Sequence, residues 1–153
     1  MKKLIITGFV LIVLIACNKD KYQTKPQISL KSVSSDVVPD GGDLNVALSY
    51  TDKEGDISDT LTILKIRLNQ TVVPTLRDTI QYKIPDFPNY DKGEIDIDMN
   101  YQNDLVSAAT PPPIQGSNPS VPQPDTLLLK FWIRDKGGHT SDTVTTGKIV
   151  VIR

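Results

Sequence analysis

Apolar and polar residues alternate along most of the chain after residue 26, and this alternation is the strongest constraint on its fold. A period of two places apolar side chains on one face of a β-strand, whereas a helix needs a period of 3.6, which no segment here sustains. Clusters of Pro, Gly and Asp separate the alternating segments, as at residues 39–42 and 136–138. The sequence therefore predicts an all-β fold, a single antiparallel β-sandwich of about seven strands within residues 27–153. The expected strands are residues 27–33, 43–50, 61–69, 78–84, 94–101, 126–134 and 143–152.

The alternation also predicts which side chains face the core. In residues 61–69 it favours Leu64 and Ile66 as inward side chains and leaves Lys65 and Arg67 on the outer face. A slip of one residue would bury charged side chains, so the register of each strand is well specified. The other predicted core residues are Leu68 in the same strand, Leu44, Val46, Leu48 and Tyr50 in the second, Ile95, Ile97, Met99 and Tyr101 in the fifth, and Leu127, Leu129, Phe131 and Ile133 in the sixth.

Two short motifs mark turns of the predicted sandwich. The first, D-x-x-G-D, occupies residues 52–56, and the second, x-D-x-x-G-x-x-S, occupies residues 134–141. With the strand spacing, they resemble the immunoglobulin-like and cadherin-like domains of bacterial surface proteins. The resemblance implies an Ig-like sandwich in which residues 61–69 and 126–134 are sheet neighbours and residues 94–101 lie in the other sheet. The disulfide and the third-strand Trp of antibody domains are absent, because the chain has one Cys and its one Trp is Trp132.

Residues 1–16 have the features of a signal peptide. Lys2 and Lys3 precede an apolar run over residues 4–16, which is too short to span a bilayer comfortably. The run ends at Leu14-Ile15-Ala16-Cys17, which resembles the lipobox of bacterial lipoproteins. The resemblance implies cleavage after residue 16 and lipidation of Cys17. The alternative is that the run forms a buried strand or an uncleaved membrane anchor.

Cleavage would leave residues 17–153 and change the net charge from −1 to −3, because two lysines are removed. Asn18 stands where an Asp would be the usual signal for retention in the inner membrane. We therefore expect a cell-envelope protein of the outer membrane, on its periplasmic face or at the cell surface. Residues 17–26 consist of the lipidated Cys and a polar tether, which spans at most about 30 Å when extended.

Residues 102–125 contain six of the eleven prolines in the chain. Proline cannot donate a hydrogen bond to a strand ladder, so we expect an extended, polyproline-like loop rather than a strand. In an Ig-like topology this connection lies at the end opposite the tether. It is either a tolerated surface insertion or a loop that docks a partner.

An acidic turn is the first candidate site. Asp52, Glu54 and Asp56 alternate around Gly55, and the Ig-like topology implies that Asp135 approaches them from the other turn. Such oxygen ligands suit calcium, which takes six to eight of them. The spacing is not that of an EF-hand. The alternative is ordinary turn chemistry, since Asp and Gly are favoured in tight loops. Calcium is therefore a candidate ligand, and no cofactor is required.

A basic and aromatic face is the second candidate site, for a protein partner or a glycan. The predicted outward side chains of two neighbouring strands would form one patch. Trp can stack on a sugar, and Lys and Arg bind carboxylates. The alternative is a half-buried Trp covered by the aliphatic stems of its neighbours. The patch comprises Lys65, Arg67, Lys130, Trp132 and Arg134. In the other sheet, Glu94, Asp96 and Asp98 form an acidic stripe.

Several function classes are disfavoured. The net charge of −1 argues against a nucleic-acid partner. One Cys excludes an internal disulfide and a Cys-rich zinc site. His139 lies near Ser141 and Asp142, but residues adjacent in one loop do not build a catalytic triad. We therefore expect a protein that is not an enzyme; a glycan-acting enzyme with two carboxylates is the least favoured class.

These observations favour a membrane-anchored lipoprotein that serves as a non-catalytic binding or assembly module of the bacterial cell envelope. It would be an accessory subunit of an outer-membrane complex or a surface ligand binder. The alternative is an adhesin-type structural domain stiffened by calcium.

Overall fold

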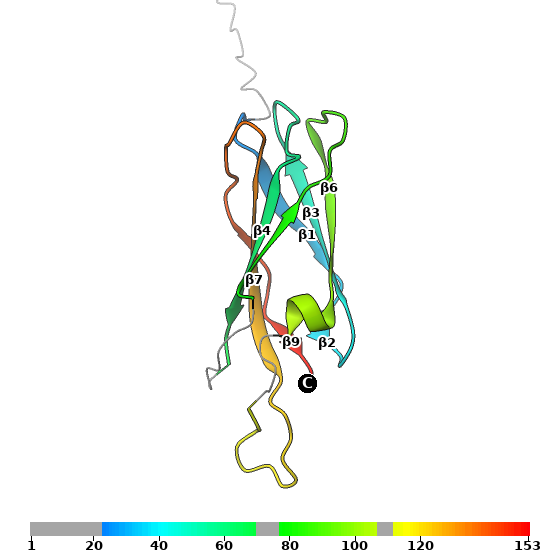
Figure 1. Cartoon of the computed structure of the whole chain (residues 1–153), viewed down its shortest axis with the longest axis vertical. Coiled ribbons are helices and arrows are strands. Elements are labelled where there is room, and N and C mark those ends of the chain that lie inside the picture. The colour runs from blue at the N-terminus through cyan, green and yellow to red at the C-terminus, as the bar shows by residue number, and fades with distance from the viewer. Residues whose placement is uncertain (1–22, 70–76, 107–111) are drawn as a thin grey trace, which may run out of the picture.

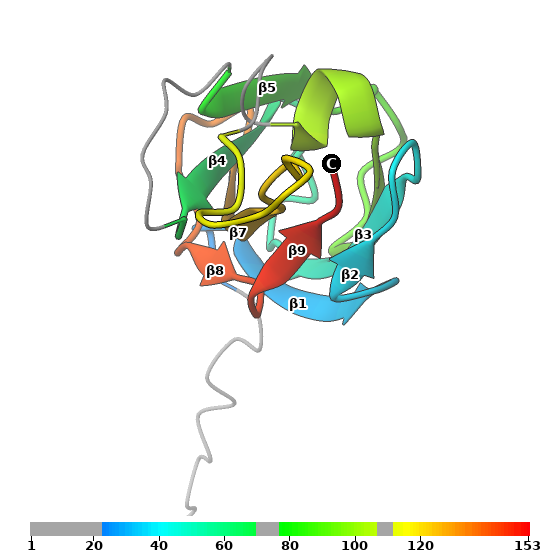
Figure 2. The ribbon, with the colours of Figure 1, turned by 90° about the horizontal axis from the view of Figure 1, so that it is seen from below.

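Two β-sheets pack face to face in the computed structural model, which describes residues 23–69, 77–106 and 112–153 (Figures 1 and 2). The smaller sheet has the strand order β1 (Gln27–Val33), β3 (Leu44–Thr51) and β6 (Lys92–Met99). The larger has the order β2 (Val37–Val38), β9 (Ile149–Val151), β7 (Asp125–Arg134), β4 (Thr60–Arg67) and β5 (Thr79–Lys83), with β8 (Val144–Thr145) also paired to β7. The predicted signal peptide, Cys17 and the first part of the tether lie outside the described residues.

The predicted all-β sandwich is confirmed. The expected neighbours β4 and β7 pair antiparallel, and β6 lies in the other sheet. Two details differ from the prediction. The last predicted strand is divided into β8 and β9, and the added strand β2 runs parallel to β9. The β4–β7 and β3–β6 pairs are eight residues long and position the loops of the two ends.

The core lies between the sheets, and the predicted phases of β3, β6 and β7 are correct. Their inward side chains are buried, with Leu44, Leu48, Met99 and Phe131 fully inaccessible to solvent. Ile95, at the open side of β6, is only partly buried. Alternation specifies these strands well because each carries an unbroken run of apolar residues on one face.

The predicted phase of β4 is wrong. Lys65 and Arg67 face the core, opposite Leu129 and Leu127 of β7, and Lys65 is 4% exposed. Both phases of β4 carry apolar residues, so hydrophobicity alone does not decide between them. The core-facing charges are compensated, because Lys65 Nζ donates a hydrogen bond of 2.6 Å to the Asp104 carbonyl and Arg67 forms an ion pair with Asp125. Buried charges persist where such partners exist.

The two ends of the sandwich are distinct. At the proximal end, where the described chain begins, the Lys53 amide donates a hydrogen bond to the Gln23 carbonyl, so the chain enters beside the β3–β4 turn. The β7–β8 turn lies at the same end (Figure 1). The connection from β6 to β7 lies at the opposite, distal end, as the topology predicted (Figure 1).

The proline-rich connection is more ordered than predicted. It begins with a single π-helical turn, η1 (Tyr101–Leu105), which the Asn100 side chain caps by accepting hydrogen bonds from two backbone amides. Residues 112–123 then form a hairpin with a bridge between Pro113 and Pro122. As expected, no strand forms in residues 112–124, but the loop is held by two backbone hydrogen bonds, in which the Ile114 and Gln123 amides donate to the Val121 and Pro112 carbonyls at 2.8 Å. Residues 107–111 lie outside the described part of the chain.

Candidate functional site

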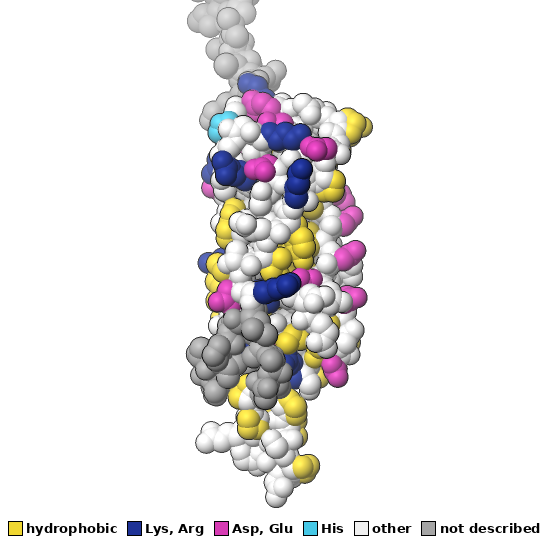
Figure 3. All heavy atoms as spheres, in the orientation of Figure 1, with side chains coloured by type: hydrophobic (Ala, Val, Ile, Leu, Met, Phe, Trp, Pro, Cys, Tyr) yellow, Lys and Arg dark blue, Asp and Glu magenta, His cyan; other side chains and the backbone are white. Residues whose placement is uncertain are grey.

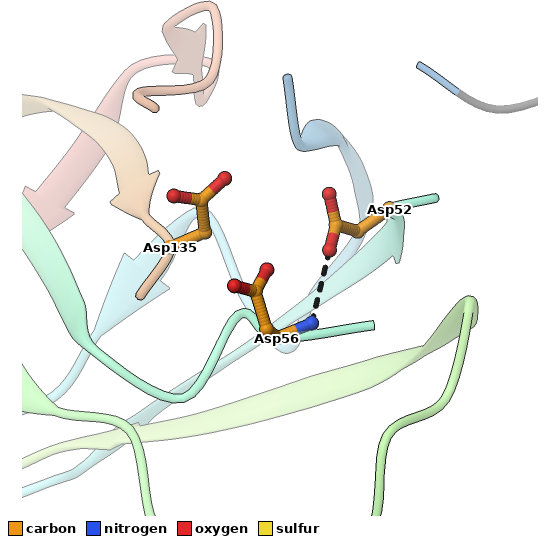
Figure 4. Close-up of side chains that lie close together, drawn as sticks. All are labelled: Asp52, Asp56 and Asp135. Atoms are coloured by element: carbon orange, nitrogen blue, oxygen red, sulfur yellow. Dashed lines mark hydrogen bonds between the residues drawn. The ribbon is translucent and has the colours of Figure 1, made fainter. Parts of the chain in front are cut away.

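Three aspartates meet at the proximal end. Asp52 and Asp56 come from the β3–β4 turn and Asp135 from the start of the β7–β8 turn, and their carboxylates lie close together in Figure 4. One carboxylate oxygen of each lies within 4.8 Å of the others. The predicted approach of Asp135 to the acidic turn is therefore confirmed as geometry. Glu54 is the exception: its side chain is exposed and does not belong to this group, which we call the aspartate cluster.

Local turn chemistry places the aspartates. Asp52 Oδ2 accepts a hydrogen bond of 3.0 Å from the Asp56 amide, and Asp135 Oδ1 accepts one of 2.7 Å from the His139 amide. Gly55 lies between the first pair with φ of +66°, a conformation that favours glycine. A Cβ at this position would also lie 2.8 Å from the backbone nitrogen of Tyr90. Each motif thus holds a carboxylate inward by bonding it to a later amide of its own turn.

The cluster is buried and rich in negative charge. Asp52 and Asp135 are 0% and 1% exposed. Asp52 Oδ1 is buried and accepts no hydrogen bond within the described residues. Burial raises the pKa of Asp52, and the neighbouring carboxylates of Asp56 and Asp135 raise it further, although the Asp56 amide opposes them.

The partners of the cluster inside the chain are weak. In the described ranges, no Lys or Arg forms an ion pair with its members, and Asp135 has only the half-exposed His139, whose Nδ1 lies 3.1 Å from Asp135 Oδ2. An unpaired buried carboxylate is costly. A hard cation with oxygen ligands would relieve this cost, and the cluster could supply three of the six to eight oxygens that calcium takes.

The predicted basic and aromatic face is only partly assembled. Lys130, Trp132 and Arg134 lie on the outer face of β7 and are exposed or half-buried, as expected. Lys65 and Arg67 are absent from that face because β4 has the opposite phase. The strand β4 instead contributes Thr62 opposite Trp132 and Leu64 opposite Lys130. The face therefore carries two cations rather than four.

A buried charge network occupies the distal end, and sequence reasoning missed it. Asp125 is paired with both Arg67 and Arg153, whose side chains are 6% and 7% exposed. Asp104 of η1 accepts hydrogen bonds from the Tyr82 hydroxyl at 2.9 Å and the Asn100 amide at 2.8 Å. Burial, with the hydrogen bond to Asp104, raises the pKa of Tyr82 to about 12. The sequence contained one signal for this network, because Asp125 has the same inward phase as Leu127 and Leu129 in β7, and its burial could have been predicted from that phase.

The distal end also gathers exposed apolar side chains. The Leu68 amide bonds to the Thr126 carbonyl and the Ile152 amide to the Val38 carbonyl, which places both at the end from which the hairpin projects. The hairpin forms the lowest part of Figure 3, where apolar side chains reach the surface. We call this group the distal apolar end: Val37, Leu68, Ile114, Val121 and Ile152, each between 38% and 47% exposed. The sixth exposed large hydrophobic residue of the described chain, Tyr90, contacts the proximal Gly55 turn.

Searches against protein-family models, curated proteins and solved structures found no match to this chain. Among the described residues, no helix has the length and apolar character needed to cross a membrane.

Proposed function

We propose that the protein is an outer-membrane lipoprotein of the bacterial cell envelope, anchored through Cys17, which acts as a non-catalytic binding or assembly module and meets its partner with the distal apolar end. The single observation that carries the proposal is the difference between the two ends of the sandwich. The chain enters at the proximal end, while five of the six exposed large hydrophobic residues of the described chain lie at the distal end.

This difference between the two ends suits a binding protein that is anchored to a membrane. A polar tether at the proximal end would leave the distal end facing away from the membrane. Exposed apolar groups that gather in one place are typical of interaction sites, whereas isolated ones are ordinary. The hairpin brings Ile114 and Val121 together through a backbone hydrogen bond. We therefore expect another envelope protein as the partner.

The anchor is tested by metabolic labelling with a clickable fatty acid. The wild-type chain should incorporate the label and need detergent for extraction, because several acyl chains hold a protein firmly on a membrane. Cys17→Ser should lose the label and become extractable without detergent. Equal labelling of the two chains would exclude the lipid anchor.

The binding end is tested by crosslinking in intact cells followed by affinity purification. The double variant Ile114→Ser, Val121→Ser should lose the crosslinked partner, because it removes two exposed apolar side chains without entering the core. Tyr90→Ser is the matched control, since Tyr90 is 57% exposed but lies away from the distal end. Loss of the partner in the Tyr90 variant but not in the double variant would contradict the proposal.

A second candidate function is favoured by the unpartnered oxygen of Asp52. A calcium ion at the aspartate cluster would stiffen the proximal turns of an adhesin-type structural domain. Isothermal titration with calcium should give one site in the wild type and none in Asp56→Asn. Asp59→Asn, a partly exposed carboxylate of the same connection outside the cluster, should still bind. No binding in any of the three chains would leave only the turn-chemistry explanation, and equal binding in all three would place the calcium site away from the aspartate cluster.

A further inference from the structure

One edge of the smaller sheet is open. The strand β6 (Lys92–Met99) pairs with β3 on one side and has no strand on the other among the described residues. In an antiparallel pair, only alternate residues bond to a given neighbour, so the remaining N–H and C=O groups of an edge strand point outward. In the part of the chain that the structure describes, no backbone hydrogen bond uses these outward N–H and C=O groups of β6.

The other three edges are protected in familiar ways. The edge strand β1 carries a bulge at Lys31, where its register with β3 shifts. The edge strand β2 has two residues, and β5 has five. Bulges and short length both discourage strand addition. With eight residues in unbroken register with β3, β6 is the one edge that combines length and regularity in the part of the chain described.

A groove follows this edge between the two sheets. It has a volume of about 200 Å³ and runs between β5 and β6, with Leu61, Ile84 and the cation of Lys83 on one side and Ile95 and Ile97 on the other. Ile95 is only partly buried, and so is Tyr82. Alternate side chains of a strand added to β6 would point toward this apolar groove.

The outer face of the same edge is acidic. Asp96 and Asp98 are exposed and alternate with the inward Ile95 and Ile97. Figure 3 shows acidic side chains in a column along the side of the molecule that β6 forms. Glu94 continues the stripe, but Lys31 already pairs with it at 2.6 Å. Two copies of this edge would bring like charges together, which disfavours self-pairing and favours a basic partner.

We propose that β6 is a docking edge for an extended segment of another protein in which basic and apolar residues alternate. The segment adds to the smaller sheet as a fourth strand. Its backbone bonds to the outward groups of β6, its basic side chains lie beside Asp96 and Asp98, and its apolar side chains enter the groove. This edge is separate from the distal apolar end, so the inference does not depend on the lipid anchor or on that end.

The test uses a labelled ten-residue peptide of alternating Lys and Val with the full-length chain in a neutral detergent, and measures fluorescence anisotropy. The Lys–Val peptide should bind, while an alternating Glu–Val peptide should not. A Lys–Val peptide with N-methylated valines keeps every side chain but loses backbone donors, so it should bind more than about tenfold more weakly. Equal binding of the methylated peptide would show charge attraction without strand addition and overturn the proposal, as would no binding of the Lys–Val peptide at millimolar concentration.

Two further measurements locate the site. Asp96→Asn with Asp98→Asn should weaken the Lys–Val peptide several-fold, whereas Asp36→Asn with Asp142→Asn removes the same charge from exposed positions outside β6 and the groove and should not. Hydrogen exchange should slow at the amides of β6 when the peptide binds. Slowing at β1 or β5 in place of β6, or equal weakening by both double variants, would contradict the assignment.

Discussion

Both ends of the sandwich bury aspartates, but the two ends compensate them differently. At the distal end, Asp125 is held by Arg67 and Arg153, and Lys65 reaches the backbone of Asp104. At the proximal end, no Lys or Arg of the described chain pairs with the aspartate cluster. A buried carboxylate needs a cation, a proton or hydrogen-bond donors. The distal end takes its cations from the chain, whereas the aspartate cluster has only hydrogen-bond donors among the described residues.

The pKa shifts at the two ends also reflect this difference in compensation. Burial lowers the pKa of Lys65, although Asp104 opposes the change by favouring the charged ammonium. At the proximal end burial and neighbouring carboxylates act in the same direction on Asp52 and raise its pKa. The comparison therefore predicts that the distal network holds the fold together, while the aspartate cluster responds to pH and to added cations.

The largest expected effect comes from breaking the distal network. Asp125→Ala would leave Arg67 and Arg153 buried without their carboxylate, which should lower the free energy of unfolding by about 3–5 kcal/mol. Urea denaturation followed by Trp132 fluorescence measures the change. Asp142→Ala is the control, because Asp142 forms an exposed pair with Lys25 and should change stability by less than about 1 kcal/mol. Equal losses of stability in the Asp125 and Asp142 variants would contradict the predicted difference between the buried network and the exposed pair.

The next effect is that of calcium on the proximal end. An ion that binds only the folded state adds about 2.7 kcal/mol at a hundredfold excess over its dissociation constant, so the melting temperature should rise by roughly 5–10 °C. Asp56→Asn should remove most of the rise, and Asp125→Ala should keep it despite a lower starting temperature. Melts that coincide in calcium and in chelator would show that the cluster is compensated without a metal.

A smaller effect is expected from the proton at Asp52. Because its folded-state pKa is raised, the folded state holds this proton more tightly than the unfolded state, and stability falls as the pH rises from about 4 through that pKa. Asp52→Asn keeps an acceptor for the Asp56 amide but has no charge. In chelator at pH 7 it should therefore be more stable than the wild type and show a flatter pH profile. Parallel profiles of the two chains in urea melts from pH 4 to 7 would disprove this assignment.

The smallest effect is expected at Glu54, which the sequence placed among the calcium ligands. Its side chain is exposed and lies outside the aspartate cluster, so Glu54→Gln should change stability by less than about 0.5 kcal/mol. Its calcium-dependent melting shift should equal that of the wild type. A loss of the shift comparable to that in Asp56→Asn would return Glu54 to the site.

Much of the fold could be predicted from alternation. The strands β3, β6 and β7 each carry a run of apolar residues on one face, interrupted in β7 only by Asp125 at its start, so their inward residues could be predicted directly. The two motifs also indicated that Asp52, Asp56 and Asp135 meet, since the topology brings their turns to one end. Glu54 could not be excluded in this way, because spacing within a turn does not fix the direction of each side chain.

The sequence by itself determined an all-β sandwich and most of its strands, because a period of two and turn residues are local properties, while the end at which each connection lies was implied by the resemblance to Ig-like domains. Only the tertiary structure decided the phase of β4, the distal charge network and the open edge of β6. Lys65 and Arg67 can face the core because Asp104 and Asp125, 39 and 58 residues further along the chain, lie beside them. Such compensation depends on contacts between distant residues, which alternation along one strand does not encode.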